Sequence, residues 1–99
     1  MTTCTENDPE FPSDDFMGAR IWRGSDCLHI DVSTLHAPDP FVATMRLILH
    51  PAVGDQIIFH NDRDPVHLYP ELLEKGWIAE PMPSEDGSFI LNLIRVTNS

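Results

Sequence analysis

Basic residues are scarce in this chain. Six Lys and Arg stand against sixteen Asp and Glu, which gives a formal net charge of −10 over 99 residues. A surface with this charge repels the phosphate backbones of nucleic acids and the anionic headgroups of lipids. The sequence therefore predicts neither a nucleic-acid partner nor a membrane partner.

Long apolar runs are also missing. Aliphatic or aromatic stretches such as 47–49 and 57–59 contain three residues each, whereas a helix needs about 20 to span a bilayer. The segment from Met1 to Cys4 has neither the basic nor the apolar region of a secretion signal. We therefore expect a cytoplasmic protein.

Cysteines and familiar catalytic motifs are equally sparse. Cys4 and Cys27 cannot build a disulfide framework, so we expect both to be reduced thiols. The sequence contains no Cys-x-x-Cys metal spacing, no glycine-rich phosphate loop and no recognisable Ser-His-Asp arrangement. It therefore predicts no cofactor and favours a non-enzymatic protein, without deciding whether the protein is an enzyme.

The composition nevertheless permits one folded domain. Apolar residues make up 41% of the chain, which is enough for a modest core without metals or disulfides. Residues 1–18 are rich in acidic residues and contain no Lys or Arg. We therefore expect a disordered acidic tail followed by a domain over 19–99. Phe11, Phe16 and Met17 are the tail residues that could pack onto that domain.

Alternation and proline positions predict the first elements of the domain. Residues 27–32 alternate in hydrophobicity as a strand does, and 20–23 form a second, shorter candidate. Apolar residues recur at helical spacing after Pro38-Asp39-Pro40, which predicts a helix from residue 38 to about residue 49. A run rich in β-branched and aromatic residues predicts an inner strand at 56–60.

A second helix is predicted between Asp64-Pro65 and Gly76. Asp64 is suited to cap the helix, Pro65 to its first turn and Gly76 to its left-handed end. Pro70 would fall inside this helix, where proline removes a hydrogen bond. We therefore expect a distorted opening turn and regular helix from about Pro70.

The end of the chain predicts a hairpin. Strands at 77–82 and 88–96 flank Asp86-Gly87, a strong turn signal. Pro81 and Pro83 favour an edge position for the first strand. The second strand is apolar on both faces and should be central.

This order, βαβαββ, predicts an α+β fold, a two-layer α/β sandwich in which two helices cover one face of a mixed four-stranded sheet. The other face is left open, and large exposed apolar patches usually mark interfaces. We expect this face to be covered by the N-terminal segment with Trp22 or by a second copy of the chain, which would form a homodimer.

Several short motifs carry a family resemblance. They are Ile30-Asp31-Val32, Pro38-Asp39-Pro40, Gly54-Asp55, His60-Asn61-Asp62-Arg63-Asp64-Pro65, Leu72-Leu73, Gly76-Trp77 and Arg95-Val96. By these residues the chain from His29 to Val96 resembles DUF2249, a family of uncharacterised small bacterial and archaeal domains related to the SirA/TusA-like sulfur carriers. Those carriers have Cys-Pro-x-Pro at the first helix, with the cysteine at the helix N-terminus. Here that position is Ala37.

The resemblance implies a SirA/TusA-like fold that lacks the sulfur-carrier cysteine. Members of the family also occur beside hemerythrin-like and other redox modules of nitrogen-oxide metabolism. A setting in redox or nitrogen-oxide metabolism is therefore what the resemblance implies for this chain.

The candidate functional residues gather at one predicted edge of the sheet. Loops at the carboxyl ends of parallel strands converge beside helix starts and commonly hold sites. The candidates for a ligand or partner edge are His36, Pro38, Asp39, Pro40, His60, Asn61, Asp62, Asp64 and His67. Imidazoles and carboxylates can also hold a divalent metal, and His60, Asp64 and His67 are the candidate ligands.

Three interpretations of this edge stay open. The residues could order the loop through caps and turns, recognise a protein partner or small ligand, or hold a metal. The leading hypothesis is a non-enzymatic binding or accessory module. The alternatives are a sulfur- or metal-handling protein, which would use this cluster or Cys27, and a small enzyme in which His60 is a general base.

Overall fold

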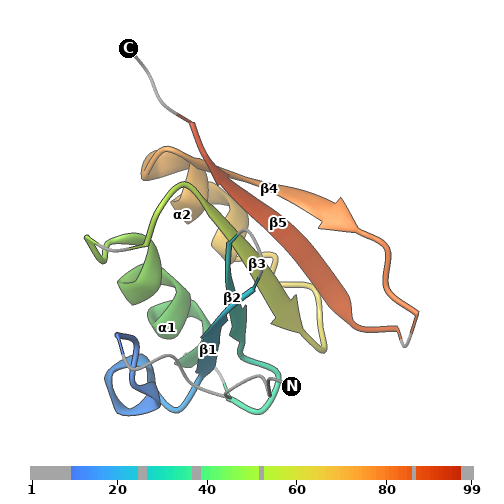
Figure 1. Cartoon of the computed structure of the whole chain (residues 1–99). Helices are drawn as coiled ribbons and strands as arrows, with labels where there is room; N and C mark the ends of the chain where they lie inside the picture. Colours follow the sequence, from blue (N-terminus) through green and yellow to red (C-terminus); the bar gives the residue numbers. More distant parts are fainter. Residues whose placement is uncertain (1–9, 25–26, 37–38, 52, 86, 97–99) are drawn as a thin grey trace.

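The computed structural model describes residues 10–24, 27–36, 39–51, 53–85 and 87–96 (Figure 1). A short 3-10 helix, η1, precedes five strands and two α-helices. In chain order the elements are η1 (Ser13–Phe16), β1 (Arg20–Arg23), β2 (Leu28–Asp31), α1 (Asp39–Ile48), β3 (Gln56–Asn61), α2 (Leu68–Glu74), β4 (Trp77–Met82) and β5 (Phe89–Arg95).

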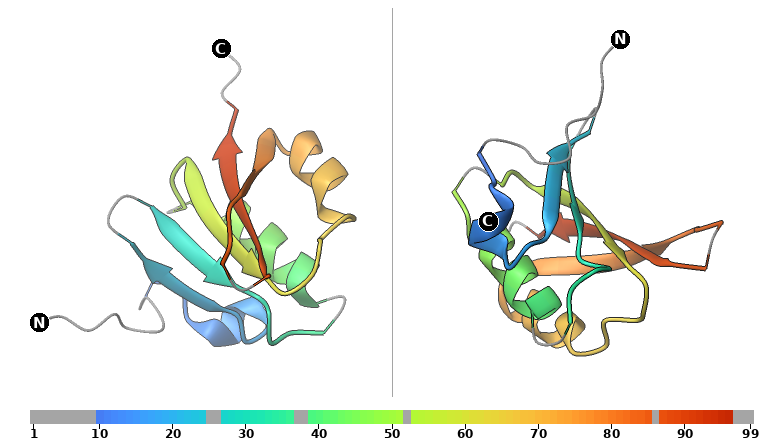
Figure 2. Two further views of the ribbon diagram at one scale, coloured as in Figure 1. Left: turned by 90° about the vertical axis from the view of Figure 1, so that its right-hand side faces the viewer. Right: turned by 90° about the horizontal axis from the view of Figure 1, so that it is seen from below.

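The five strands form one mixed sheet in the order β1-β2-β3-β5-β4. Strands β2 and β3 are parallel, and the other neighbouring pairs are antiparallel. Both helices lie on the same face of this sheet (Figures 1 and 2). The α+β prediction with a mixed sheet is therefore confirmed. So are the central position of β5 and the edge position of β4.

The prediction of four strands is wrong, because β1 adds a fifth. Strand β1 pairs with β2, with Ile21 opposite Ile30, and both side chains are fully buried. The aromatic rings of Phe11 and Phe16 belong to the same buried cluster. Strand β1 is stable at this edge because the segment before it covers the apolar face of the strand, which the two helices alone do not cover.

The first described residues therefore belong to the folded domain. Phe11 is fully buried and Phe16 is 3% exposed, and the two rings lie 6.1 Å apart beside His50. The prediction of a disordered tail over 1–18 therefore does not hold for residues 10–18. Residues 1–9 lie outside the part of the chain that the structure describes. The segment packs beside α1 on the helix side of the sheet (Figure 2). It therefore leaves the opposite face of the sheet open.

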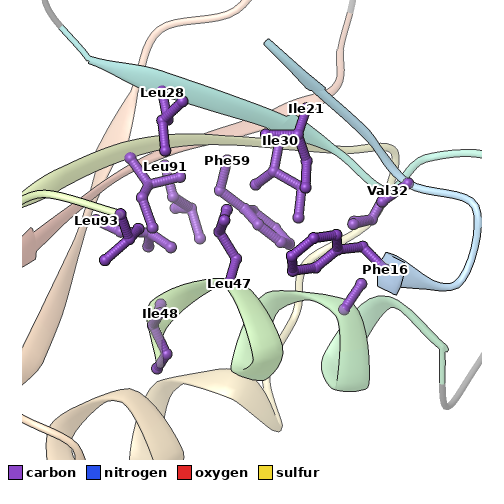
Figure 3. Packing of buried hydrophobic residues seen from close by; sticks show 14 of the residues in the cluster. Phe16, Ile21, Leu28, Ile30, Val32, Leu47, Ile48, Phe59, Leu91 and Leu93 are labelled. Carbon is purple, nitrogen blue, oxygen red and sulfur yellow. The ribbon is translucent and has the colours of Figure 1, made fainter. Parts of the chain in front are cut away.

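The core lies between the sheet and α1 (Figure 3). Leu47 of α1 points toward Phe59 of β3, and Ile48 of α1 and Leu91 and Leu93 of β5 belong to the same cluster; these side chains are at most 3% exposed. Apolar burial of this kind contributes about 25 cal/mol for each Å² removed from water.

The second helix differs from its prediction at its start. It begins at Leu68 with His67 as N-cap residue, so the prediction of Asp64 as the cap is wrong. The reason is Pro70. A helix that begins at Leu68 places Pro70 within the first turn, where backbone N–H groups have no partner inside the helix. A helix from Pro65 would place Pro70 in the interior and break the hydrogen-bond ladder.

No helix among the described residues is long and apolar enough to cross a membrane.

Replacing Phe11 with alanine should destabilise the domain. Deleting a fully buried phenylalanine ring typically lowers the free energy of unfolding by about 3–5 kcal/mol. Phe89→Ala is the matched control, because Phe89 is 40% exposed and its loss should have a much smaller effect. Urea denaturation of both variants measures the difference. Equal midpoints for Phe11→Ala and the unchanged chain would show that the segment does not belong to the cooperative unit.

Candidate functional site

A pocket opens on the helix side of the sheet, where β3 ends and both helices begin. It has a volume of about 160 Å³ and mostly apolar walls. Its lining residues are Leu35, Pro40, Phe41, Phe59, Asn61, Arg63, Asp64, Pro65, Val66, His67 and Leu68. Four of the predicted edge residues, Pro40, Asn61, Asp64 and His67, therefore lie around one cavity.

Asn61 is the buried polar residue of the pocket. Its side chain is on the helix side of β3 and the residue is 4% exposed. Its Oδ1 accepts a hydrogen bond of 2.8 Å from the backbone N–H of Asp62. This bond stabilises the turn that leaves β3 and orders one end of the pocket wall.

Asp64 is positioned by Tyr69. The phenol of Tyr69 donates a hydrogen bond of 2.8 Å to Oδ1 of Asp64. Burial, followed by this hydrogen bond, raises the pKa of Tyr69 to about 12. Tyr69 therefore remains a protonated donor at physiological pH, and the Asp64 carboxylate is held at the pocket by the first turn of α2.

His60 faces the other way. Side chains alternate between the two faces along a strand, and Asn61 points toward the helices, so His60 lies on the open face of the sheet. The imidazole ring there lies beside His29 of β2, with 3.0 Å between His29 Nδ1 and His60 Nε2. The indole of Trp22 stacks on both rings, with ring centroids 5.1 Å from His29 and 5.5 Å from His60.

Both imidazoles of this pair favour the neutral form. Burial, and then the charge of His60, lower the pKa of His29 below its ordinary value. Burial also lowers the pKa of His60, although the nearby carboxylate of Asp31 acts in the opposite direction. Two neutral rings can share one hydrogen bond, in which one ring donates and the other accepts.

The remaining predicted residues are dispersed. His36 is exposed beyond β2, where its carbonyl accepts the N–H of Asp39 at the start of α1. Asp62 is exposed and forms an ion pair of 3.3 Å with its neighbour Arg63. Pro38, and Ala37 at the carrier-cysteine position, lie outside the described residues. Cys27 is half-buried next to the start of β2, whereas the pocket lies beyond the end of that strand.

The structure does not bring His60, Asp64 and His67 together as a metal site. Among the described residues, no group of three or more His, Cys, Asp or Glu side chains could hold a metal ion. The physical reason is the alternation of β3, which separates His60 from the pocket by the thickness of the sheet.

The family comparison covers most of this architecture. The model of the family described as uncharacterized conserved protein, DUF2249, matches residues 29–93. The chain belongs to the DUF2249 family. No curated protein and no solved structure gives a significant match to the chain.

The part of the chain matched to DUF2249 contains every lining residue of the pocket and both rings of the histidine pair. Strand β1 and Trp22 lie before it. The Trp22 stack is therefore built from one segment outside the DUF2249 match and two strands inside it.

The sequence pattern predicted a strand at 27–32, which contains His29, but not the pairing of His29 with Trp22 and His60. A usable signal was present. In the hairpin of β1 and β2, Trp22 stands opposite His29, and residues opposite each other on a sheet share a face and interact. His29 lies beside His60 because of the register in which β2 and β3 pair. The sequence pattern does not specify this register.

The histidine pair predicts a pH dependence of stability for this DUF2249 domain. Because the folded-state pKa values of His29 and His60 are lowered, the unfolded chain takes up protons first as pH falls through the ordinary value of 6.5. The free energy of unfolding should therefore be highest above pH 6.5 and should decrease toward the lowered folded-state pKa values.

Urea denaturation between pH 7.5 and about 5.5, where carboxylates with ordinary pKa values stay ionised, measures this dependence. The double variant His29→Gln and His60→Gln should flatten it. An equally steep loss of stability in the double variant would assign the dependence to other groups.

Proposed function

We propose that this DUF2249 domain is a non-enzymatic binding module that docks onto a partner protein through the pocket where α1, β3 and α2 meet. The observation that carries this proposal is the size of the pocket. A volume of about 160 Å³ is close to that of a cavity of roughly 150 Å³ that takes up benzene. One aromatic or branched aliphatic side chain fits this space, whereas drug-sized ligands usually occupy about 300 Å³ or more.

The lining supports an apolar anchor with polar neighbours. Phe41, Phe59 and Leu68 offer apolar contacts, and Asp64 and His67 lie among them. An inserted side chain would remove apolar wall from water, which is favourable at about 25 cal/mol for each Å². Polar groups around such a pocket fix the orientation of the bound segment.

The charge of the chain supports a basic partner segment. The net charge is −10, and the exposed carboxylate of Asp64 lines the pocket. Arg63 also lines it, but its charge is paired with Asp62. Opposite charge on the partner would steer its approach and raise the rate of association. The proposed partner therefore carries a large apolar residue flanked by lysine or arginine.

The wider setting is proposed on the resemblance and on the order of the elements. From β2 to β5 the chain runs strand, helix, strand, helix, strand, strand, which is the order that SirA/TusA-like carriers imply. On that scaffold we place the domain in the cytoplasm, in redox or nitrogen-oxide metabolism, as an accessory module.

Short blocked peptides test the pocket directly. A pentapeptide with phenylalanine between lysines should shift the backbone amide resonances of Leu35, Asn61 and Val66 in a saturable way in ¹⁵N-HSQC spectra. Replacing the phenylalanine with alanine should abolish saturation, because the anchor is lost. Replacing the lysines with glutamates should weaken binding, because the chain is acidic.

Two variants with matched chemistry locate the contact. Val66→Lys places a positive charge at the pocket and should weaken the lysine-flanked peptide about tenfold, or about 1.4 kcal/mol. Leu73→Lys is the control, because Leu73 is 65% exposed and does not line the pocket. Equal affinity of the two variants, or equal shifts with the alanine peptide, would refute the proposed docking site.

A further inference from the structure

The open face of the sheet holds a feature that the pocket does not use. His29 of β2 and His60 of β3 present their rings on this face, with Nδ1 of one 3.0 Å from Nε2 of the other. The two rings are almost parallel, with an angle of 20° between their planes. Both helices cover the opposite face (Figure 2), so solvent reaches the half-buried pair from the open side.

We propose that His29 and His60 together bind one divalent transition-metal ion, with Cu²⁺ preferred over Zn²⁺. Neutral imidazole is a common ligand for Cu, Ni and Zn. Among the described residues no third ligand completes a protein cage, so water occupies the remaining positions. The site is distinct from the docking pocket, because the thickness of the sheet separates the two.

The separation of the nitrogens is compatible with a tetragonal metal ion. Imidazole nitrogens usually lie about 2.0–2.1 Å from a bound ion. With the two nitrogens 3.0 Å apart, the N–metal–N angle would be about 94°. This angle suits the square or tetragonal geometry of Cu²⁺ and Ni²⁺, whereas tetrahedral Zn²⁺ requires an angle near 109°. Cu²⁺ also forms the tightest complexes among these ions with a given set of ligands.

Binding needs a change of tautomer and a rotation of the rings. In the unliganded pair one ring donates its N–H to the other, so one of the two facing nitrogens carries a proton and both nitrogens point along the line that joins them. When the ion binds, the donating ring holds its proton on the other nitrogen, and both rings rotate so that their lone pairs converge on the ion. Two metal–nitrogen bonds replace one hydrogen bond, and neutral rings release no net proton.

The surroundings hold the pair in place. Trp22 stacks on His29 with 11° between the ring planes and so covers one face of that imidazole. Asp31, next to His60 across β2 and β3, is fixed by two hydrogen bonds to its Oδ1 from the backbone N–H and the hydroxyl of Ser33. Its negative charge near His60 favours a cation at the pair.

Gly24 provides the space that His29 occupies. A Cβ atom at position 24 would lie 2.6 Å from Nε2 of His29, which is too close for any real contact. An alanine there would therefore push the flexible end of His29 away from its present position. Gly24 does not have a left-handed backbone conformation, and the nearest backbone atom, the carbonyl oxygen of Cys27, would lie 3.3 Å from the new Cβ. The substitution should therefore displace His29 at a smaller cost to the fold.

Cu²⁺ titration of the full chain tests the proposal, with Cys4→Ser and Cys27→Ser introduced so that thiols neither bind nor reduce the ion. Paramagnetic Cu²⁺ should broaden the indole N–H resonance of Trp22 at substoichiometric ratios. The indole of Trp77 is an internal control, because Trp77 is buried on the helix side of the sheet. Calorimetry should give one ion per chain at this site.

Single variants assign the ligands. His29→Gln and His60→Gln should each weaken Cu²⁺ binding at least about tenfold, because one imidazole remains. Gly24→Ala should weaken binding in the same direction with little loss of stability. His36→Gln and His67→Gln, in exposed histidines away from the pair, should leave binding unchanged. Zn²⁺ should bind more weakly than Cu²⁺ to the unchanged pair.

Three results would overturn the proposal. They are a sharp Trp22 resonance in excess Cu²⁺, binding that survives both His29→Gln and His60→Gln, and equal losses of affinity in the control variants. None of these results bears on the peptide-docking pocket, so the two proposals stand or fall separately.

Discussion

The alternation of side chains along β3 is the constraint on which the rest of the molecule depends. Its buried residues Ile57, Phe59 and Asn61 face the helices, and the core is assembled on them. Ile58 and His60 therefore face the opposite side. A shift of one residue in this strand would exchange the two sets, placing an imidazole in the core and Phe59 in solvent. The burial of Phe59 thus determines both the pocket and the position of the histidine pair.

Local patterns predicted the elements well because their causes are local. The antiparallel pairing of β4 with β5 agrees with the predicted hairpin, although Asp86 of its turn lies outside the described residues. The expected helix at 38–49 agrees closely with α1 at Asp39–Ile48. The start of α2 followed in part. The irregular opening turn and a regular helix near Pro70 agree with α2 at Leu68–Glu74, whereas the cap did not follow, because two helix-start signals, Asp64-Pro65 and Pro70, competed in one segment. The structure resolves this competition in favour of Pro70.

The candidate site was predictable only in part, because it depends on which face each side chain occupies. Pro40, Asn61, Asp64 and His67, which were grouped from the sequence, line one cavity near the end of β3. His60 was grouped with them because it is adjacent in sequence, although adjacency within a strand places side chains on opposite faces. The fifth strand was also underweighted, since its stability depends on Phe11 and Phe16 from a segment whose acidic composition is typical of disorder.

Pro70 has a further consequence for the wall of the pocket. Because proline is tolerated only near the beginning of a helix, α2 cannot wind backward through residues 64–67 without breaking its own ladder. Those residues are therefore kept as an irregular connection with side chains directed along the cavity. The pyrrolidine ring of Pro70 in the first turn thus prevents α2 from extending over the opening of the pocket.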